Sequence, residues 1–123
     1  RPGGGDLVHV RGRHAAGDLT GRLSALGLPA RGLEIYDQIA VPPPAEAAAL
    51  LAAGRVDVLT AFSPRSAALF AATSRAEGWD LSAATLVALS ATADAAHDAP
   101  APGRRVVSET PTRAGMIAAL ASL

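Results

Sequence analysis

The sequence predicts one α/β domain whose parallel sheet has about five strands, with helices on both faces. Segments with strand-like apolar patterns alternate strictly with segments of helical spacing, in the order βαβαβαβαβα. The third strand-like segment is a nearly continuous apolar run, as expected of a strand buried on both faces of a parallel sheet. At 123 residues the chain is long enough to bury its own core without a disulfide or a metal.

The first three elements are marked by leucines and glycines. Residues 7–11 indicate a short strand that ends at Gly12. Residues 19–26 have leucines at helical spacing and predict a helix closed by Gly27. Residues 33–39 alternate apolar and polar side chains, which is typical of a half-buried strand.

The middle of the chain contains the clearest start signals. Residues 42–44 are three prolines, which break the chain and open a helix over 45–53. Residues 56–62 predict a strand buried on both faces. Ser63 as N-cap and Pro64 at the first helical position then predict the next helix.

The same alternation continues to the end of the chain. Residues 86–89 predict a fourth strand and residues 90–96 a short helix. After the proline-rich stretch 99–103, residues 105–107 predict the last strand. The final helix opens at residues 110–112. The whole pattern fits a flavodoxin-like three-layer domain.

Composition excludes several kinds of chemistry. The formal net charge is zero, which argues against non-specific binding to nucleic acid or to an anionic membrane. All eleven strongly basic residues are arginine, so no lysine is available for a Schiff base, and no cysteine is available as a nucleophile or zinc ligand. No apolar run approaches the ~20 residues of a membrane span. We expect a cytoplasmic protein.

Motifs for cofactors are missing from the sequence. It has no G-x-x-x-x-G-K and no G-x-G-x-x-G after a strand, so the usual phosphate-binding loops for a nucleotide are missing. His9, His14 and His97 lack metal-ligand spacing. We therefore expect neither a cofactor nor a metal site.

The carboxyl ends of the predicted strands are where a ligand is expected, because ligands of open parallel sheets bind there. Three strand-to-helix corners carry hydroxyl groups, which together would form a neutral hydrogen-bonding rim suited to carboxylates. The residues concerned are Ser63, Ser90 with Thr92, and Thr110 with Thr112. Each of them can equally be an ordinary helix cap. Tyr36, the single tyrosine, is either a packed core residue or a functional hydroxyl.

Taken in order, these motifs resemble the C-terminal half of the uroporphyrinogen-III synthase family. The resemblance rests on Ile35-Tyr36-Asp37-Gln38, on the corner Phe62-Ser63-Pro64-Arg65-Ser66, on Val87-Ala88-Leu89-Ser90-Ala91-Thr92-Ala93 and on Pro111-Thr112. One departure is visible. Family members usually have Gly-x-x-Thr after the fourth strand, where this chain has Ser90-Ala91-Thr92-Ala93.

The resemblance implies a lyase of haem and tetrapyrrole biosynthesis, which cyclises hydroxymethylbilane to uroporphyrinogen III with inversion of ring D and without a cofactor. Tyr36 would then be the acid near the departing hydroxyl. The substrate's carboxylates would be bound by Ser63, Arg65, Ser66, Ser90, Thr92 and Thr112. Transient contact with hydroxymethylbilane synthase would follow from a shared intermediate.

The family's two-lobed architecture sets further expectations. Residues 1–32 would be a strand-helix unit of the second lobe, and residues 33–123 would be the main lobe with its crossover strand. The N-terminal half of the chain would be missing, upstream of a linker-like start at residues 1–5, and the remainder would be weakly active at most. Two alternatives stay open: a non-catalytic tetrapyrrole-binding or regulatory module of the same fold, and an unrelated flavodoxin-like binding domain.

Overall fold

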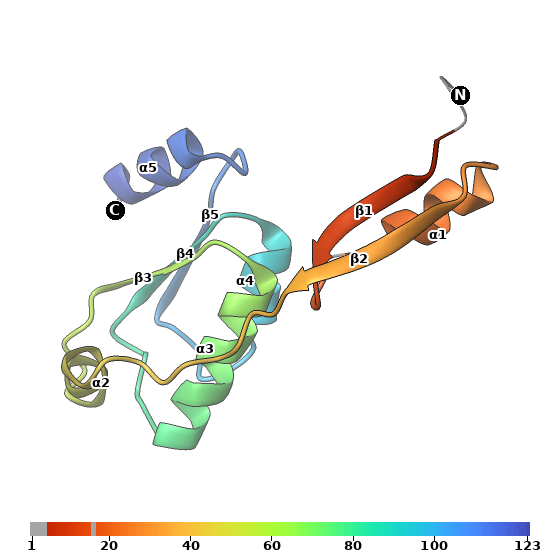
Figure 1. The fold of residues 1–123 in the computed structure, drawn as a ribbon. Helices are drawn as coiled ribbons and strands as arrows, with labels where there is room; N and C mark the ends of the chain where they lie inside the picture. The colour runs from red at the N-terminus through yellow and green to blue at the C-terminus, as the bar shows by residue number, and fades with distance from the viewer. Residues whose placement is uncertain (1–4, 16) are drawn as a thin grey trace. The chain divides into compact units, whose positions relative to one another are not determined.

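The computed structural model describes residues 5–15 and 17–123. Residues 1–4 of the predicted linker-like start lie outside them. Over the described residues, five strands alternate with five helices, which confirms the predicted α/β class and the element order (Figure 1). The strands are β1 (Leu7–Gly12), β2 (Ala30–Tyr36), β3 (Val58–Ala61), β4 (Thr85–Ala88) and β5 (Arg104–Val107). The helices are α1 (Leu19–Ala25), α2 (Ala45–Ala52), α3 (Pro64–Glu77), α4 (Ala91–Ala96) and α5 (Arg113–Ala121).

The five strands form two parallel sheets where we predicted one. β1 pairs with β2, and β3, β4 and β5 pair in that order. The chain divides between Val41 and Pro42 into two compact units. Three prolines begin there, and proline has no N–H with which to extend a strand ladder. We placed the domain boundary after residue 32, whereas this division leaves the whole of β2 with the N-terminal unit.

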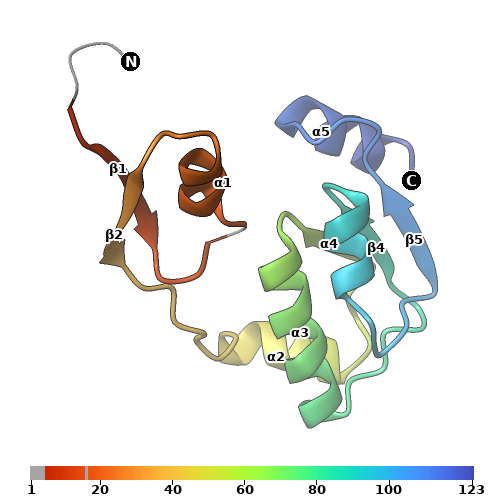
Figure 2. The same cartoon turned by 90° about the vertical axis from the view of Figure 1, so that its right-hand side faces the viewer.

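The N-terminal unit, residues 1–41, consists of the β1–β2 pair and α1, which contacts β2 (Figure 2). β2 begins three residues earlier than predicted because Ala30 already pairs with Leu7. It ends at Tyr36, so the alternating residues 37–39 lie beyond the sheet, and Ile39 is exposed. Asp18 caps α1, and its carboxylate accepts from the backbone N–H of Gly21 at 2.8 Å.

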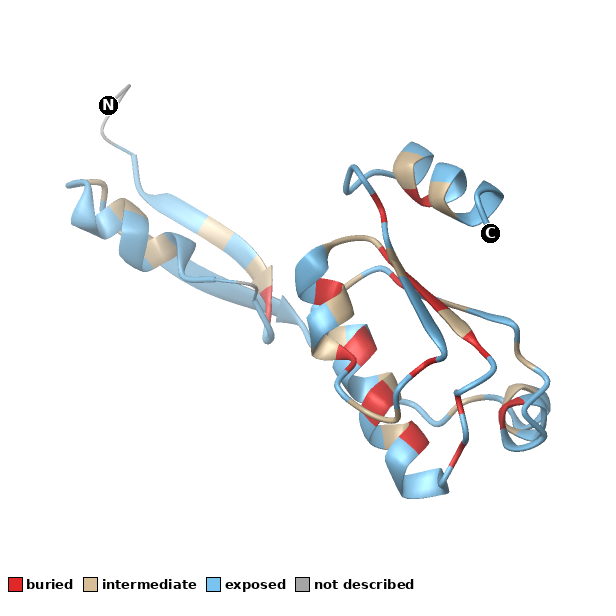
Figure 3. Cartoon of the chain, turned by 180° about the vertical axis from the view of Figure 1, so that it is seen from behind, coloured by how far each residue is buried: buried red, intermediate tan, exposed pale blue. Residues whose placement is uncertain are grey.

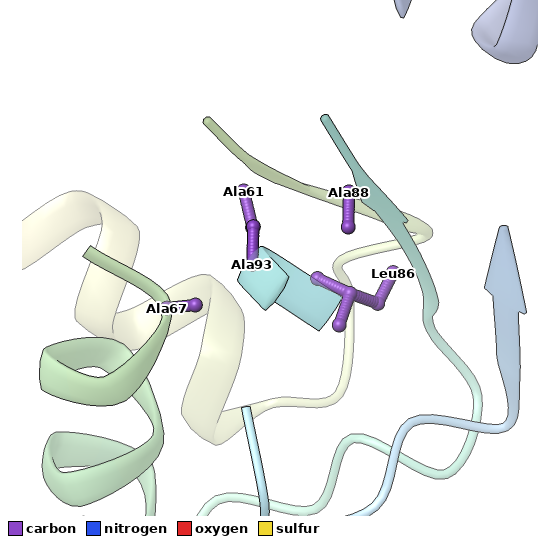
Figure 4. Close-up of a cluster of buried hydrophobic side chains, with 5 residues drawn as sticks. All are labelled: Ala61, Ala67, Leu86, Ala88 and Ala93. Carbon is purple, nitrogen blue, oxygen red and sulfur yellow. The ribbon is translucent and has the colours of Figure 1, made fainter. Parts of the chain in front are cut away.

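The C-terminal unit, residues 42–123, has its core around β4, the central strand of its sheet. Buried residues lie along β4 and on one side of α3 (Figure 3). α3 and α4 pack against one face of this sheet through small side chains (Figure 4). The cluster consists of Ala61, Ala67, Leu86, Ala88 and Ala93. Because alanine side chains are short, both helices lie close to the strands.

A second cluster lies beside α2. Leu51 of α2 packs with Trp79 and Leu81, which follow α3. α3 itself begins at the Ser63 cap with Pro64 in its first turn, as predicted, and ends at Gly78 in the left-handed conformation, with φ of +67°. At that φ a residue with a Cβ would be strained, which explains glycine there.

Candidate functional site

The carboxyl edge of the C-terminal sheet carries three helix starts side by side. Ser63 precedes α3 after β3, Ser90 precedes α4 after β4, and Thr112 precedes α5 after β5. The three strands are parallel neighbours, so the three starts lie at one edge of the sheet. Neighbouring strands of a sheet are about 4.8 Å apart, so the three strand ends that lead to these starts are close neighbours.

Each of the three residues is an N-cap. The Ser63 Oγ accepts from the backbone N–H of Ser66 at 3.1 Å, and the Ser90 Oγ accepts from that of Ala93 at 3.3 Å. The Thr112 Oγ1 accepts from the N–H of Gly115 at 3.1 Å. These bonds satisfy one free N–H of each helix and leave other first-turn N–H groups directed toward the edge. The prediction that these residues are caps is confirmed.

Each cap hydroxyl is also paired with a second hydroxyl. Ser63 Oγ donates to Ser66 Oγ at 3.0 Å, Ser90 and Thr92 are 3.0 Å apart, and Thr110 and Thr112 are 3.1 Å apart. We call these six residues the hydroxyl row. A pair contains two O–H groups and uses one of them internally, so the other can donate to a ligand. Ser66, Thr92, Thr110 and Thr112 are exposed.

The hydroxyl row therefore has the chemistry of a carboxylate site. It offers O–H and N–H donors at the positive ends of three helices, and a carboxylate accepts from both kinds of donor. Arg65, in the first turn of α3, is half-buried and adds a positive charge to the start of that helix. The structure thus brings together six predicted site residues: Ser63, Arg65, Ser66, Ser90, Thr92 and Thr112.

Tyr36, the seventh predicted site residue, belongs to the N-terminal unit, at the end of β2. Its side chain is 56% exposed, so the interpretation of Tyr36 as a packed core residue is wrong. Its ring lies against Gly12, which is its register partner in β1. Its hydroxyl is thus presented at the carboxyl edge of the β1–β2 pair.

Sequence reasoning did not find Arg105, which holds the end of α4. Its guanidinium donates to the carbonyl of Asp94 at 3.0 Å, to the Asp94 carboxylate at 2.9 Å and to the carbonyl of His97 at 2.6 Å. These bonds satisfy carbonyls at the C-terminus of a six-residue helix. Because α4 also carries Ser90 and Thr92 at its other end, Arg105 fixes the middle of the hydroxyl row.

His97 is a second residue that the sequence did not single out. It is 1% exposed, and neither ring nitrogen has a hydrogen-bond partner within the described part of the chain. Its ring lies 5.7 Å from that of Phe70, and it lines a cavity of about 210 Å³ between α3 and the sheet. Burial lowers the pKa of the His97 imidazole, with a smaller contribution from the nearby charge of Arg105.

A larger cavity, of about 450 Å³, lies between β5 and α5. Its lining includes Thr110 of the hydroxyl row, the neighbouring Glu109, and small residues of α5 such as Ala118. Gly115 keeps the start of α5 close to the strand, because a Cβ there would overlap the backbone carbonyl of Thr110. The hydroxyl row therefore continues into a hollow beside the edge strand.

Ion pairs also lie at the surface away from the hydroxyl row. In the N-terminal unit Arg11 binds Glu34 at 2.8 Å and Arg13 binds Asp37 at 3.1 Å. Across residues 5–15 and 17–123, no group of three or more His, Asp or Glu is arranged to hold a metal ion. Nor does any helix in those ranges have the length and apolar character to cross a membrane.

Comparison with known proteins gives one match. The family model described as Uroporphyrinogen-III synthase HemD matches residues 1–118. No curated protein and no solved structure matches the chain significantly. The match conflicts with our prediction that the sequence corresponds only to the C-terminal half of a family member and lacks its N-terminal half. We therefore withdraw that prediction, together with the weak activity expected from it.

Proposed function

We propose, since the chain belongs to the uroporphyrinogen-III synthase family, that it cyclises hydroxymethylbilane to uroporphyrinogen III with inversion of ring D. This reaction would make it a lyase of tetrapyrrole and haem biosynthesis. A cytoplasmic location and transient contact with hydroxymethylbilane synthase remain predictions.

The observation that carries the proposal is the hydroxyl row. The substrate is a flexible chain of four pyrrole rings with carboxylate side chains. Three donor pairs at helix starts that follow neighbouring strands can hold several carboxylates at once. Holding these groups restricts the conformations of the chain, and such orientation can supply a large part of a cyclisation barrier. Spontaneous closure gives the non-inverted isomer, so the enzyme's task is mainly conformational.

The proposed proton chemistry begins at Tyr36. Its phenol gives a proton to the substrate hydroxyl, the C–O bond breaks and water departs. The N–H proton of the same pyrrole ring then returns to the phenolate, which leaves a neutral, electrophilic azafulvene. A substituted carbon of ring D attacks this centre and gives a spiro intermediate. The intermediate fragments and closes again with ring D inverted, and loss of a proton restores the aromatic pyrrole. The exposed phenol at the end of β2 is accessible for this role.

Arg65 and the helix starts supply the electrostatic part of the proposal. Carboxylates bound at the starts of α3 and α5 interact favourably with the positive end of each helix. The Arg65 guanidinium adds a full charge within the first turn of α3. These groups lie in the first turns of helices whose N-caps are hydrogen-bonded, so they need little reorganisation when the substrate binds.

The test is a product analysis. The purified protein is mixed with freshly generated hydroxymethylbilane, and the products are oxidised and separated as isomers. We expect uroporphyrinogen III to form well above the uncatalysed rate. Only the non-inverted isomer, formed at the uncatalysed rate, would refute the proposal.

The alternative of a non-catalytic binding module rests on Ser90, which stands where the family usually has glycine. A module of this kind would bind uroporphyrin at the hydroxyl row but leave the isomer ratio of the products unchanged. Titration with uroporphyrin alongside the product analysis therefore separates the two functions.

A further inference from the structure

Phe62 is an exposed aromatic residue at one end of the hydroxyl row. The chain has four Phe, Trp and Tyr residues. Phe70 and Trp79 pack together with ring centroids 6.2 Å apart, and the Tyr36 ring lies against Gly12. Phe62 is 57% exposed, although Ala61 immediately before it is 4% exposed. Of the two phenylalanines, only Phe62 lies largely in solvent.

The position of Phe62 matters more than its exposure, since single apolar residues are common on protein surfaces. It directly follows β3, one of the two edge strands of the C-terminal sheet as described, and directly precedes Ser63. The Ser63–Ser66 hydroxyl pair, the first turn of α3 and the Arg65 guanidinium are therefore its nearest neighbours along the chain. An exposed apolar residue thus comes directly before the proposed carboxylate-binding corner in the chain.

The exposed ring of Phe62 and the hydroxyl groups that follow it match the two parts of a pyrrole unit with acidic side chains, the ring and the carboxylate. Such a unit has a flat apolar face and a carboxylate a few bonds away. The hydroxyl row offers donors for the carboxylate, but it offers nothing to the ring face. A phenyl ring provides a large rigid surface for the face at little cost in conformational entropy.

We propose that Phe62 packs against the face of one pyrrole ring of the substrate while a carboxylate of that ring is bound at the Ser63–Ser66 corner. The inference rests on the proposed function and names the residue that fixes the position of that ring. Because the contact exists before and during the reaction, its loss raises KM and leaves kcat nearly unchanged.

The experiment compares three variants of the purified protein. Phe62→Leu keeps an apolar side chain but removes the ring face, and Phe62→Tyr keeps the ring. Ile117→Ala is the matched control, because Ile117 of α5 is 56% exposed and lies outside the hydroxyl row. KM and kcat are measured with hydroxymethylbilane, and affinity is measured separately by titration with uroporphyrin, a planar tetrapyrrole with eight carboxylates.

We expect Phe62→Leu to raise KM and to weaken uroporphyrin binding about tenfold, the size of a lost aromatic stacking contact. Phe62→Tyr and Ile117→Ala should stay within about twofold of the unmodified protein. Unchanged affinity in Phe62→Leu, or an equal loss in Ile117→Ala, would overturn the inference.

The two readouts also separate this inference from the proposed function. If uroporphyrinogen III forms and Phe62→Leu behaves like the unmodified protein, the ring contact is wrong and the proposed function stands. If only the non-inverted isomer forms, the proposed function fails, and the titration alone then decides whether Phe62 contacts a tetrapyrrole.

Discussion

The ring of Tyr36 lies directly against the α-carbon of Gly12. A Cβ at Gly12 would be 2.5 Å from the Cε2 atom and 2.8 Å from the Cζ atom of the ring. The two residues are partners at an irregularity in the β1–β2 register, and the carbonyl of Tyr36 accepts from the backbone N–H of Arg13 at 2.9 Å. The absence of a side chain at Gly12 therefore determines where the phenol lies.

Tyr36→Phe removes the proposed acid and should lower turnover without unfolding the protein. Gly12→Ala is expected to displace the Tyr36 ring and to lower turnover in the same direction. The ring is more than half exposed and can move outward, so the free energy of unfolding should fall by only about 1 kcal/mol or less. Gly5→Ala is the control, because a Cβ at Gly5 meets nothing within 4 Å. Turnover and urea unfolding are measured for each variant, and full turnover in Gly12→Ala would contradict the acid role given to the phenol in that position.

Comparing Ser63→Ala with Ser66→Ala should distinguish an effect on the free energy of unfolding from an effect on substrate binding. Ser63 caps α3, so its loss should cost about 1 kcal/mol of unfolding free energy and also weaken substrate binding. Ser66 is exposed and its hydroxyl accepts from Ser63, so Ser66→Ala should change stability by less than about 0.5 kcal/mol and still raise KM. Equal KM values for Ser66→Ala and the unmodified protein would remove this pair from the carboxylate site.

Arg105→Met should destabilise the C-terminal unit by about 2 kcal/mol, because it removes three hydrogen bonds from a charged donor and leaves the carbonyls of Asp94 and His97 without it. Lysine at this position can make only some of these hydrogen bonds. The free energy of unfolding of Arg105→Lys should therefore lie between those of the unmodified protein and Arg105→Met. Urea unfolding gives the ranking. An unchanged urea midpoint of unfolding in Arg105→Met would show that α4 does not need the hydrogen bonds of Arg105.

His97 should make the protein less stable in acid. Burial lowers the pKa of its imidazole in the folded state, so below the unfolded-state value of about 6.5 the unfolded chain takes up a proton that the folded chain resists. The free energy of unfolding is therefore not reduced by His97 above that value. It falls as the pH decreases from there until the pKa of the folded state is reached. Asp94 and Asp98 oppose the shift and Arg105 reinforces it.

The check is His97→Phe, which keeps a ring next to Phe70 and removes two buried nitrogens that have no partner. The free energies of unfolding of both proteins are compared between about pH 7.5 and pH 5, a range that brackets the ordinary pKa of histidine. The difference should favour the variant by about 1 kcal/mol at the upper end and grow toward the lower end. Parallel curves would rule out His97 as the group that titrates.

The local signals in the sequence predicted most of the elements and all three helix caps. Ser63-Pro64 and Thr112 mark helix starts through bonds to residues three positions further along, which a sequence displays directly. The division into two sheets, by contrast, depends on contacts between residues far apart in the sequence. The alternating stretch 33–39 fits a strand in either sheet, and only the non-local pairing with β1 decides the matter.

The supporting contacts of the site could not be predicted for the same reason. Arg105 resembles any other arginine until β5 places it beside the end of α4, eight to eleven residues earlier in the chain. His97 follows a short alanine-rich helix, and nothing in that stretch marks it as buried. The roles given to Tyr36 and to the hydroxyl row remain predictions that rest on the family and on their accessibility.

The alanine cluster beneath the hydroxyl row has one further consequence. Alanine has no χ angle, so the four alanines of this cluster have no rotamers to exchange and lose no side-chain entropy on folding; Leu86 is its one buried side chain that does. The alanines therefore fix the distance of α3 and α4 from the sheet through their backbone. A substrate of different carboxylate spacing could not be accommodated by repacking these four side chains, and would require the helices themselves to shift on the sheet.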